Sequence, residues 1–474
     1  MMKIIIFGTG KYYNKYKKWF NDAEMVALLD NNIDLQGTNI DGIKVFSPSS
    51  ISSLSYDYIY ILSLREEEMR NQLLEYGVCS EKIKSWRDLT IDHTWFAERK
   101  PIKSYIETSS NNTARSILFI SDNLERTGGN IAELYMAQAL KECGYNITFV
   151  SGNDGPLRND EMFSNLNYLI DPNIQVERLI DIEYIYHYGM VILNTIYLYL
   201  MLRERPVHIP VIWWLHEPES VYSTVKEDDL NVIKQAGLYI FGVSDFARDA
   251  FYSKTRKFDV GILPLGEPDL SKKAKESSYR NNKKTVFGVA GVISQIKGQE
   301  ILLEAIKNLM SIDMERSEFL FAGNAQSAYG RGFTEKVSSL NNANVKYIGE
   351  LDESKMLEFY RKIDVLIVPS ITETLSMTAI EAMMFAKPSI VSTGAGISTF
   401  INNKYNGYIF NNKNIDELRE LISYCINNPK NRKIVGLRAR QLYNDVFNLK
   451  YFRIKLFEIV RKIMDADCKM KLDI

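Results

Sequence analysis

The chain has 474 residues, with 58 basic and 59 acidic side chains and a net charge of −1. This balance excludes the basic excess that is typical of nucleic-acid-binding proteins. Its composition, 46 % hydrophobic and 25 % charged, is typical of globular domains, and at about 100–200 residues per domain two to four domains are expected.

In chain order, the first block spans about 90 residues and alternates strands with helices. An apolar run at 4–7 leads to Gly8 and Gly10, then a helix, and a second strand ends at Asp30. This order resembles the dinucleotide-binding fingerprint of Rossmann-like domains. Tyr13 occupies the third glycine position, so we expect an accessory domain that binds NAD poorly.

The helix after the first strand is basic and aromatic, which predicts either a solvated helix face or contact with a membrane surface. The residues concerned are Lys11, Lys15, Lys17, Lys18, Tyr12, Tyr16 and Trp19.

Two more α/β blocks follow, at about 115–268 and 285–450, with polar linkers before each of them. Their alternation of strands and helices predicts parallel sheets covered by helices on both faces. The expected strands lie at 117–120, 147–150, 191–193, 211–215, 239–243, 286–290, 319–322, 345–348, 365–368 and 389–391. The predicted domains are 1–95, 115–268 and 285–450, followed by a C-terminal helix and tail at 451–474. The linkers are 91–114 and 271–284.

The most apolar stretch, 184–202, includes His187, Gly189 and Asn194, so we expect a buried strand and a helix rather than a membrane span. The N-terminus lacks the pattern of a signal peptide. The cysteines and histidines are scattered, which predicts no disulfide framework and no metal site. They are Cys79, Cys143, Cys425, Cys468, His93, His187, His208 and His216. We expect a cytoplasmic protein.

The most informative segment, PSITETLSMTAIEAMMFAKPSIVSTGAG, covers 369–396. A buried strand ends before it, and a helix is expected to begin near Ser376 and Met377. A helix N-terminus can hold a phosphate, and carboxylates can accept hydrogen bonds from sugar hydroxyls. Glu373 in the loop and Glu381 within the helix therefore suit a nucleotide sugar, although either residue alone would suggest a helix cap or a solvated residue.

Three other segments follow predicted strands. Gly291 begins a loop that ends in Lys297 and Gly298, and an ammonium there suits a diphosphate. Gly128 and Gly129 allow a ligand to approach the backbone. His216 ends a buried strand, where a sugar contact and a core histidine are both reasonable interpretations.

Together, these segments of 115–465 resemble family 4 of the retaining glycosyltransferases, the group 1 transferases with the GT-B fold. Glu373 and Glu381 match the family's Glu–seven residues–Glu motif, and Lys297 matches its diphosphate lysine. The resemblance implies an α/β fold with two facing Rossmann-like domains, preceded here by a third. This sequence departs from the family at Val292, where an arginine is usual, and at Ser376, where a glycine is usual.

The resemblance implies metal-independent transfer of a sugar from a nucleoside diphosphate sugar to a hydroxyl, with retention of configuration and no cofactor. His216, Lys297 and Glu373 are the expected catalytic residues. The expected donor-binding residues are Gly128, Gly129, Gly291, Lys297, Glu373, Ser376, Met377 and Glu381. A saccharide or lipid-linked saccharide acceptor for surface polysaccharide or glycoconjugate synthesis would fit, with possible peripheral membrane contact.

Two other functions remain open from the sequence. A catalytically inactive binding or chaperone subunit would explain the missing arginine. A nucleotide-sugar epimerase would use the same donor contacts without an acceptor. The sequence does not specify the donor base, the sugar, the acceptor or the oligomeric state.

Overall fold

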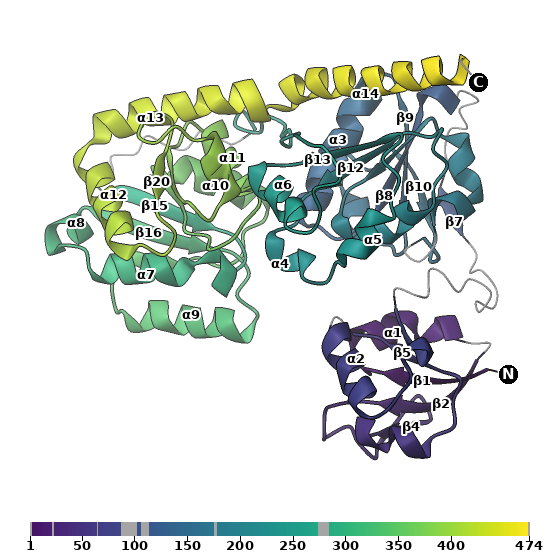
Figure 1. The fold of residues 1–474 in the computed structure, drawn as a ribbon. Coiled ribbons are helices and arrows are strands. Elements are labelled where there is room, and N and C mark those ends of the chain that lie inside the picture. The colour runs from purple at the N-terminus through teal and green to yellow at the C-terminus, as the bar shows by residue number, and fades with distance from the viewer. Residues whose placement is uncertain are drawn as a thin grey trace.

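The computed structural model describes residues 2–20, 23–63, 65–86, 102–105, 113–174, 178–273 and 284–472. Three α/β units follow one another along the chain, each built on one mainly parallel sheet (Figure 1). The expected fold class is therefore confirmed. Most of the predicted linkers, including 106–112 and 274–283, and also His93, lie outside the described residues.

The first unit contains a six-stranded sheet in the order β3-β4-β2-β1-β5-β6. Its central strand is apolar and buried on both faces, as expected for a parallel strand covered by helices. Its strands are β1 (Lys3–Phe7), β2 (Glu24–Leu29), β3 (Asn39–Ile40), β4 (Ile43–Phe46), β5 (Tyr58–Ile61) and β6 (Ile83–Ser85), and its helices are α1 (Lys11–Tyr16) and α2 (Glu66–Glu75).

The second unit contains eight strands in the order β14-β13-β12-β11-β8-β9-β10-β7. The strands are β7 (Lys103–Tyr105), β8 (Ser116–Ser121), β9 (Asn146–Ser151), β10 (Asn167–Ile170), β11 (Met190–Leu193), β12 (Val211–Leu215), β13 (Leu238–Gly242) and β14 (Val260–Ile262). Its helices include α3 (Gly128–Glu142), α4 (Glu219–Tyr222), α5 (Glu227–Asn231) and α6 (Asp245–Tyr252).

The prediction that 91–114 is only a linker is wrong at one point. Strand β7 lies in this segment and pairs antiparallel with β10 at the edge of the second sheet. Its sequence, KSY, is too short to show a strand pattern. In the apolar stretch 184–202, the expected strand is present as β11, and a 3₁₀ helix, Ile196–Arg203, follows it. Within the described ranges, no helix is both long and apolar enough to span a bilayer.

The third unit contains six strands in the order β17-β16-β15-β18-β19-β20. They are β15 (Thr285–Ala290), β16 (Ser317–Ala322), β17 (Val345–Tyr347), β18 (Val365–Val368), β19 (Ser389–Ser392) and β20 (Tyr408–Phe410). The helices are α7 (Gln299–Lys307), α8 (Ser311–Glu315), α9 (Ala328–Ser339), α10 (Glu353–Lys362), α11 (Met377–Met384), α12 (Ile415–Asn427) and α13 (Pro429–Leu442).

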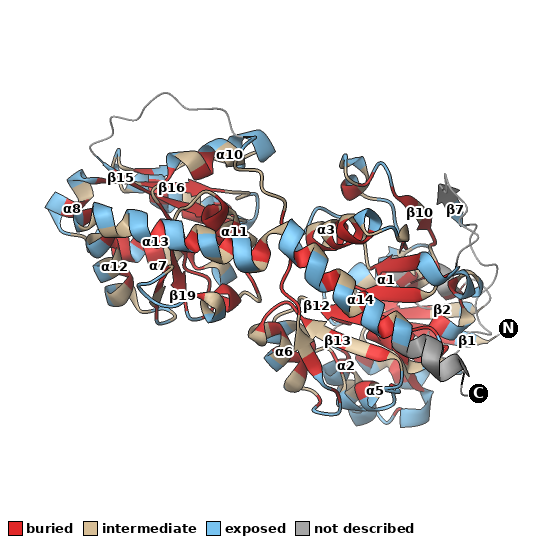
Figure 2. Cartoon of the chain, turned by 90° about the horizontal axis from the view of Figure 1, so that it is seen from above, coloured by how far each residue is buried: buried red, intermediate tan, exposed pale blue. Residues whose placement is uncertain are grey.

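The expected C-terminal helix is present as α14 (Leu449–Leu472), and it lies against the second unit. It packs against α3, where Arg453 pairs with Glu142, and Phe452 stacks on Trp214 of β12 with ring centroids 6.2 Å apart. Seen from above, α13 and α14 run in succession across the third and second units, with exposed outer faces over buried strands (Figure 2). This return of the chain ties the two units together.

Ligands of open α/β sheets bind at the carboxyl ends of the strands, where the strand order reverses. In the second sheet this point lies between β8 and β11, and in the third it lies between β15 and β18. The loops that follow these four strands contain most of the residues that the sequence singled out.

Candidate active site

The loop after β18 holds Glu373 in place through its backbone. The Glu373 amide donates to the carbonyl of Gly394 at 3.0 Å, and the Gly396 amide donates to the carbonyl of Glu373 at 2.7 Å. A Cβ on Gly394 would lie 2.3 Å from the Ile371 carbonyl oxygen, and one on Gly396 would lie 1.9 Å from that of Thr374. The glycine-rich turn after β19 is therefore required for this loop to close.

The Glu373 carboxylate contacts Lys297, which lies in the loop after β15. Lys297 Nζ lies 2.5 Å from Glu373 Oε1, and the Ser370 hydroxyl donates to Glu373 Oε2 at 2.7 Å. The side chains of Lys297 and Glu373 are 31 % and 12 % exposed, so the ammonium still reaches solvent. This pair places one cation and one acceptor group at the point where the strand order reverses.

Gly298 brings these two loops together. Its φ is +67°, a left-handed conformation that favours glycine, and a Cβ there would lie 2.1 Å from the Pro369 carbonyl oxygen. Gly298 also precedes α7, so the N-terminus of that helix begins beside Lys297.

The second unit places His216 opposite this pair. Glu217 accepts hydrogen bonds from the His216 amide, the Ile196 amide and the Thr195 hydroxyl, and so fixes the end of β12. Nε2 of His216 is buried and has no hydrogen-bond partner. Burial lowers the pKa of His216 to about 3, so the imidazole is neutral and one ring nitrogen is able to bond a ligand.

Gly128 and Gly129 begin α3, whose first turn is capped by the Thr127 hydroxyl. A Cβ on Gly128 would lie 3.1 Å from Met377 Sδ, and one on Gly129 would lie 3.8 Å from Cγ of His216. The glycine pair therefore lies between His216 of its own unit and Met377 of the third unit. Side chains at these positions would fill the space between the two units.

Hydrogen bonds join the two units directly at this place. The Thr374 hydroxyl donates to the His216 carbonyl oxygen at 2.6 Å, and the Ser244 hydroxyl donates to the Thr374 carbonyl oxygen. Beside them, a cavity of about 290 Å³ is bounded on one side by α4 and α6 and on the other by the Glu373 loop. Its lining residues are Pro218, Glu219, Phe246, Asp249, Ala250, Thr372, Glu373 and Thr374.

Glu381 has different partners from Glu373. It lies on α11, and Oε2 accepts a hydrogen bond from the Tyr360 hydroxyl of α10 at 2.5 Å. Burial raises the pKa of Glu381 to about 7, and burial together with the charge of Glu381 raises the pKa of Glu267. The two carboxylates of the motif therefore occupy separate environments. Glu373 lies in the loop beside Lys297, and Glu381 lies on α11 beside Tyr360.

The departures from the family pattern are both accommodated without backbone strain. Ser376 precedes α11 with a φ of −110°, which any residue adopts, and its hydroxyl lies 3.1 Å from that of Thr378. Val292 is 58 % exposed next to Gly291, whose φ is +136°. An apolar side chain at the surface of this loop supplies no charge to a phosphate.

The sequence analysis missed a buried polar network beneath the glycine pair. Asn194 donates to the Gly129 carbonyl at 3.0 Å and to Glu133 at 3.3 Å, and the Ser121 hydroxyl donates to Glu133 at 2.5 Å. Burial raises the pKa of Glu133 to about 8. Ser121 ends β8 and Asn194 follows β11, on either side of the point where the strand order reverses. Their position after these two strands could have indicated the network from the sequence.

Residues of the dinucleotide fingerprint in the N-terminal unit are bonded to other residues of the same unit. Asp30 Oδ2 accepts hydrogen bonds from the amide and hydroxyl of Thr9, at 2.9 and 2.5 Å, so the carboxylate expected near a ribose is already occupied. Tyr13 is 1 % exposed and donates to Asp41. Tyr16 is buried against Trp86, so it is not a membrane-facing side chain. The occupied carboxylate of Asp30 and the buried ring of Tyr13 argue against an NAD site in this unit.

No group of three or more metal-ligating side chains is found among the residues that the structure describes.

Two parts of the chain match known protein families. Residues 271–442 match the family model described as glycosyl transferases group 1, and residues 1–84 match one described as C2185-like, N-terminal. The third unit of the chain is thus similar to the group 1 glycosyl transferases. The first match contains Lys297, Glu373 and Glu381, which the sequence analysis had singled out.

The curated proteins that this chain resembles are distant relatives. An uncharacterized glycosyltransferase of Methanocaldococcus jannaschii is 28 % identical over 180 residues, which cover 38 % of this chain and 48 % of that protein. The lipopolysaccharide 1,2-N-acetylglucosaminetransferase of Salmonella typhimurium is 26 % identical over 46 % of this chain and 58 % of its own length. The chain thus spans about half or less of the first curated relatives that it matches.

Solved structures share the fold. HepE of Anabaena, in complex with UDP, superposes with a TM-score of 0.60 at 15 % identity, covering 73 % of this chain and 100 % of that one. Sucrose-phosphate synthase from Thermosynechococcus elongatus gives a TM-score of 0.59 at 16 % identity, over 74 % and 100 %. These likenesses show the GT-B fold for the second and third units together.

Proposed function

We propose that this protein is a retaining, metal-independent glycosyltransferase that moves a sugar from a nucleoside diphosphate sugar to a hydroxyl acceptor. The observation that carries the proposal is the 2.5 Å pair between Lys297 and Glu373, which lies across from His216 and Gly128–Gly129. A cation, a hydrogen-bond acceptor and a neutral imidazole on facing sheet edges suit a bound pyrophosphoryl sugar.

In this proposal Lys297 stabilises the charge that grows on the leaving diphosphate, together with backbone amides at the start of α11, whereas the Gly291 amide is already bonded to the Ala322 carbonyl at 3.1 Å. A preorganised cation in a partly buried site is worth several times more than the same cation in water. Val292 offers no second cation, so more of this stabilisation depends on Lys297 than in a protein with an arginine there.

Glu373 would hold hydroxyls of the donor sugar after Lys297 turns from it to the phosphate. His216 would donate or accept a hydrogen bond beside the reacting carbon through the unpartnered Nε2. Glu381 would accept ribose hydroxyls, in exchange for or beside its bond to Tyr360. Ser376 and Met377 would border the donor at the start of α11.

Retention of configuration needs the acceptor oxygen to attack from the face that the diphosphate leaves. The bond from the anomeric carbon to the phosphate oxygen breaks, the bond to the acceptor oxygen forms, and the acceptor proton passes to the phosphate. The protein then supplies placement and charge stabilisation and needs neither a nucleophile nor a metal.

The cavity of about 290 Å³ beside Glu373 is the place for the acceptor hydroxyl in this proposal, because it opens between the two units. HepE has been solved with UDP and with UDP-glucose, and the Salmonella relative is a lipopolysaccharide transferase. A saccharide or lipid-linked saccharide acceptor in surface polysaccharide or glycoconjugate synthesis, at the cytoplasmic face of a membrane, is the setting that we infer.

The test begins with a thermal-shift screen of the full chain against UDP, GDP and their sugars, since a ligand of the folded state raises the melting temperature. The nucleotide sugar that binds is then incubated in EDTA with and without saccharide acceptors. Transfer that requires the acceptor and keeps the anomeric configuration by NMR supports the proposal. Conversion of the donor without an acceptor would indicate an epimerase, and no binding at all would indicate an inactive subunit.

A further inference from the structure

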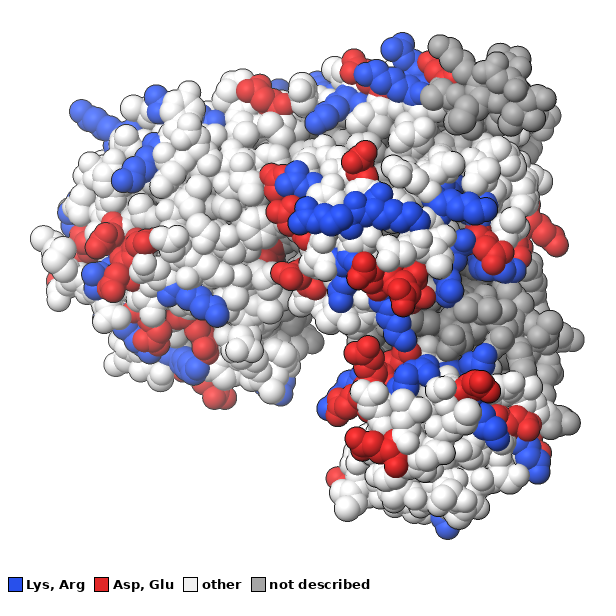
Figure 3. Space-filling view, viewed as in Figure 1, with Lys and Arg blue, Asp and Glu red and all other residues white. Residues whose placement is uncertain are grey.

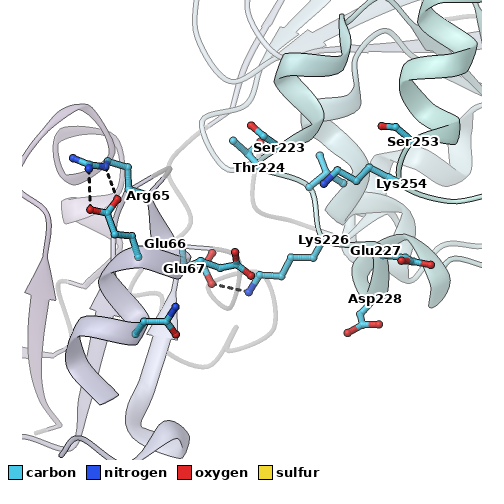
Figure 4. A pocket seen from close by; sticks show the side chains of 13 residues that line it. Arg65, Glu66, Glu67, Ser223, Thr224, Lys226, Glu227, Asp228, Ser253 and Lys254 are labelled. Atoms are coloured by element: carbon cyan, nitrogen blue, oxygen red, sulfur yellow. Dashed lines mark hydrogen bonds and ion pairs between the residues drawn. The ribbon is translucent and has the colours of Figure 1, made fainter. Parts of the chain in front are cut away.

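A second hollow of about 940 Å³ lies between the N-terminal unit and the second unit (Figure 4). One wall is the start of α2, and the other consists of the segments that follow α4 and α6. Its residues are Arg65, Glu66, Glu67, Glu68, Asn71, Ser223, Thr224, Val225, Lys226, Glu227, Asp228, Ser253 and Lys254. The volume lies in the range of roughly 300–1,000 Å³ that is typical of ligand sites.

An ion pair joins the two walls of this groove. Lys226 Nζ of the second unit lies 2.8 Å from Oε1 of Glu66, a residue that is 2 % exposed at the start of α2. Arg65 forms a two-point contact with Glu68 at 2.9 and 2.8 Å. Of the contacts drawn as dashed lines in Figure 4, the one between Lys226 and Glu66 joins the two walls, and those between Arg65 and Glu68 lie within one wall.

The lining indicates what kind of ligand fits. Acids outnumber bases, which disfavours a phosphate or an anionic lipid headgroup, and Val225 is the single aliphatic residue among those given above. Carboxylates, hydroxyls and an amide are hydrogen-bonding partners for sugar hydroxyls. Charged side chains of both signs also lie along both sides of the crevice in the surface view (Figure 3). An uncharged saccharide fits this surface best.

The groove adjoins the cavity at Glu373 through the same two short helices. Asp249 of α6 lines the cavity and Ser253, at the end of α6, lines the groove. The Ser253 amide donates to the Asp249 carbonyl at 2.9 Å, so these two lining residues are one helical turn apart, about 6 Å along the axis. Likewise, Glu219 begins α4 at the cavity, and Ser223 follows α4 at the groove.

We propose that the groove between α2 and the segments after α4 and α6 binds an uncharged saccharide segment of the acceptor, remote from the reacting hydroxyl. The inference rests on the proposed transferase function, and it gives the N-terminal unit a role in acceptor selection. A chain held at both sites would run from the N-terminal unit along α6 to Glu373.

The experiment measures binding of short uncharged oligosaccharides, and of uronic-acid oligosaccharides, to the full chain on a glycan array and by calorimetry without nucleotide. Ser253→Trp fills the groove from an exposed position. Ser339→Trp is the matched control, because Ser253 and Ser339 are both exposed, end a helix and donate to the carbonyl three residues earlier, at 2.7 and 2.8 Å. Circular dichroism checks that both variants fold.

We expect uncharged oligosaccharides to bind the unaltered chain. Their affinity should fall by about tenfold or more in Ser253→Trp and should stay unchanged in Ser339→Trp. The inference is overturned if no uncharged oligosaccharide binds, if acidic ones bind better, or if Ser253→Trp binds like the unaltered chain. UDP binding is measured separately on the unaltered chain, so failure of the donor proposal and failure of the groove proposal give different results.

Discussion

The hydroxyl of Thr374 in the third unit donates a hydrogen bond of 2.6 Å to the carbonyl oxygen of His216 in the second unit. This bond joins the loop that carries Glu373 to the strand end that carries His216. The arrangement of the two units is therefore coupled to the position of the proposed catalytic groups.

Thr374→Val keeps the shape of the side chain but removes this donor. Leaving a partly buried carbonyl unpaired costs about 1 kcal/mol or more, which corresponds to roughly a fivefold loss of transfer rate if the bond is needed in the reacting state. Thr334→Val is the control, since the Thr334 hydroxyl bonds within its own helix at 2.8 Å. Equal turnover by both variants would show that closure does not depend on this bond.

Lys297→Ala should lower the affinity for UDP and the transfer rate by about tenfold or more, because the cation that faces the diphosphate is lost. Lys336→Ala is a matched control, since Lys336 Nζ also lies 2.5 Å from a glutamate oxygen, of Glu300. Both of these side chains are exposed on helices, α9 and α7. Calorimetry with UDP and steady-state transfer assays measure the two effects. UDP affinity that is the same in both variants would contradict the role of Lys297.

Glu133→Gln tests the buried network under Gly129. The pKa of Glu133 is raised from 4.5 to about 8 by burial, so the folded state holds a proton that the unfolded state releases. Stability from this residue is thus lost as pH rises from 4.5 to 8. The melting temperature of Glu133→Gln relative to the unaltered chain should therefore increase over that range.

The exposed Glu335 provides the comparison for this pH dependence. Glu335→Gln should follow the unaltered chain at each pH. A Glu133→Gln curve that runs parallel to the unaltered chain from pH 4.5 to 8 would show that the native carboxyl is already ionised at low pH.

Lys226→Glu should separate the N-terminal unit from the second unit, because a carboxylate would then face the buried Glu66. Small-angle scattering should give a larger radius of gyration. Lys346→Glu reverses a similar pair, Lys346 with Glu318 at 2.9 Å, within the third unit and should leave the radius unchanged. An unchanged radius for Lys226→Glu would mean that other contacts dock the N-terminal unit.

The sequence by itself determined the three α/β units and predicted the candidate site residues of the third. Glu373, Glu381 and Lys297 follow buried apolar strands, and parallel sheets bring the carboxyl ends of such strands to one edge. The helix start at Met377 was predictable too, because a buried strand, a polar loop and a run of helix-forming residues succeed one another.

Only the tertiary structure decided which residues meet across the units. The contacts of Thr374 with His216, of Met377 with Gly128, and of α14 with α3 join segments more than 150 residues apart, and local propensity has no information on such distances. Burial likewise depends on the whole fold. It makes His216 neutral and keeps a proton on Glu133, because removing water disfavours the charged form of either group.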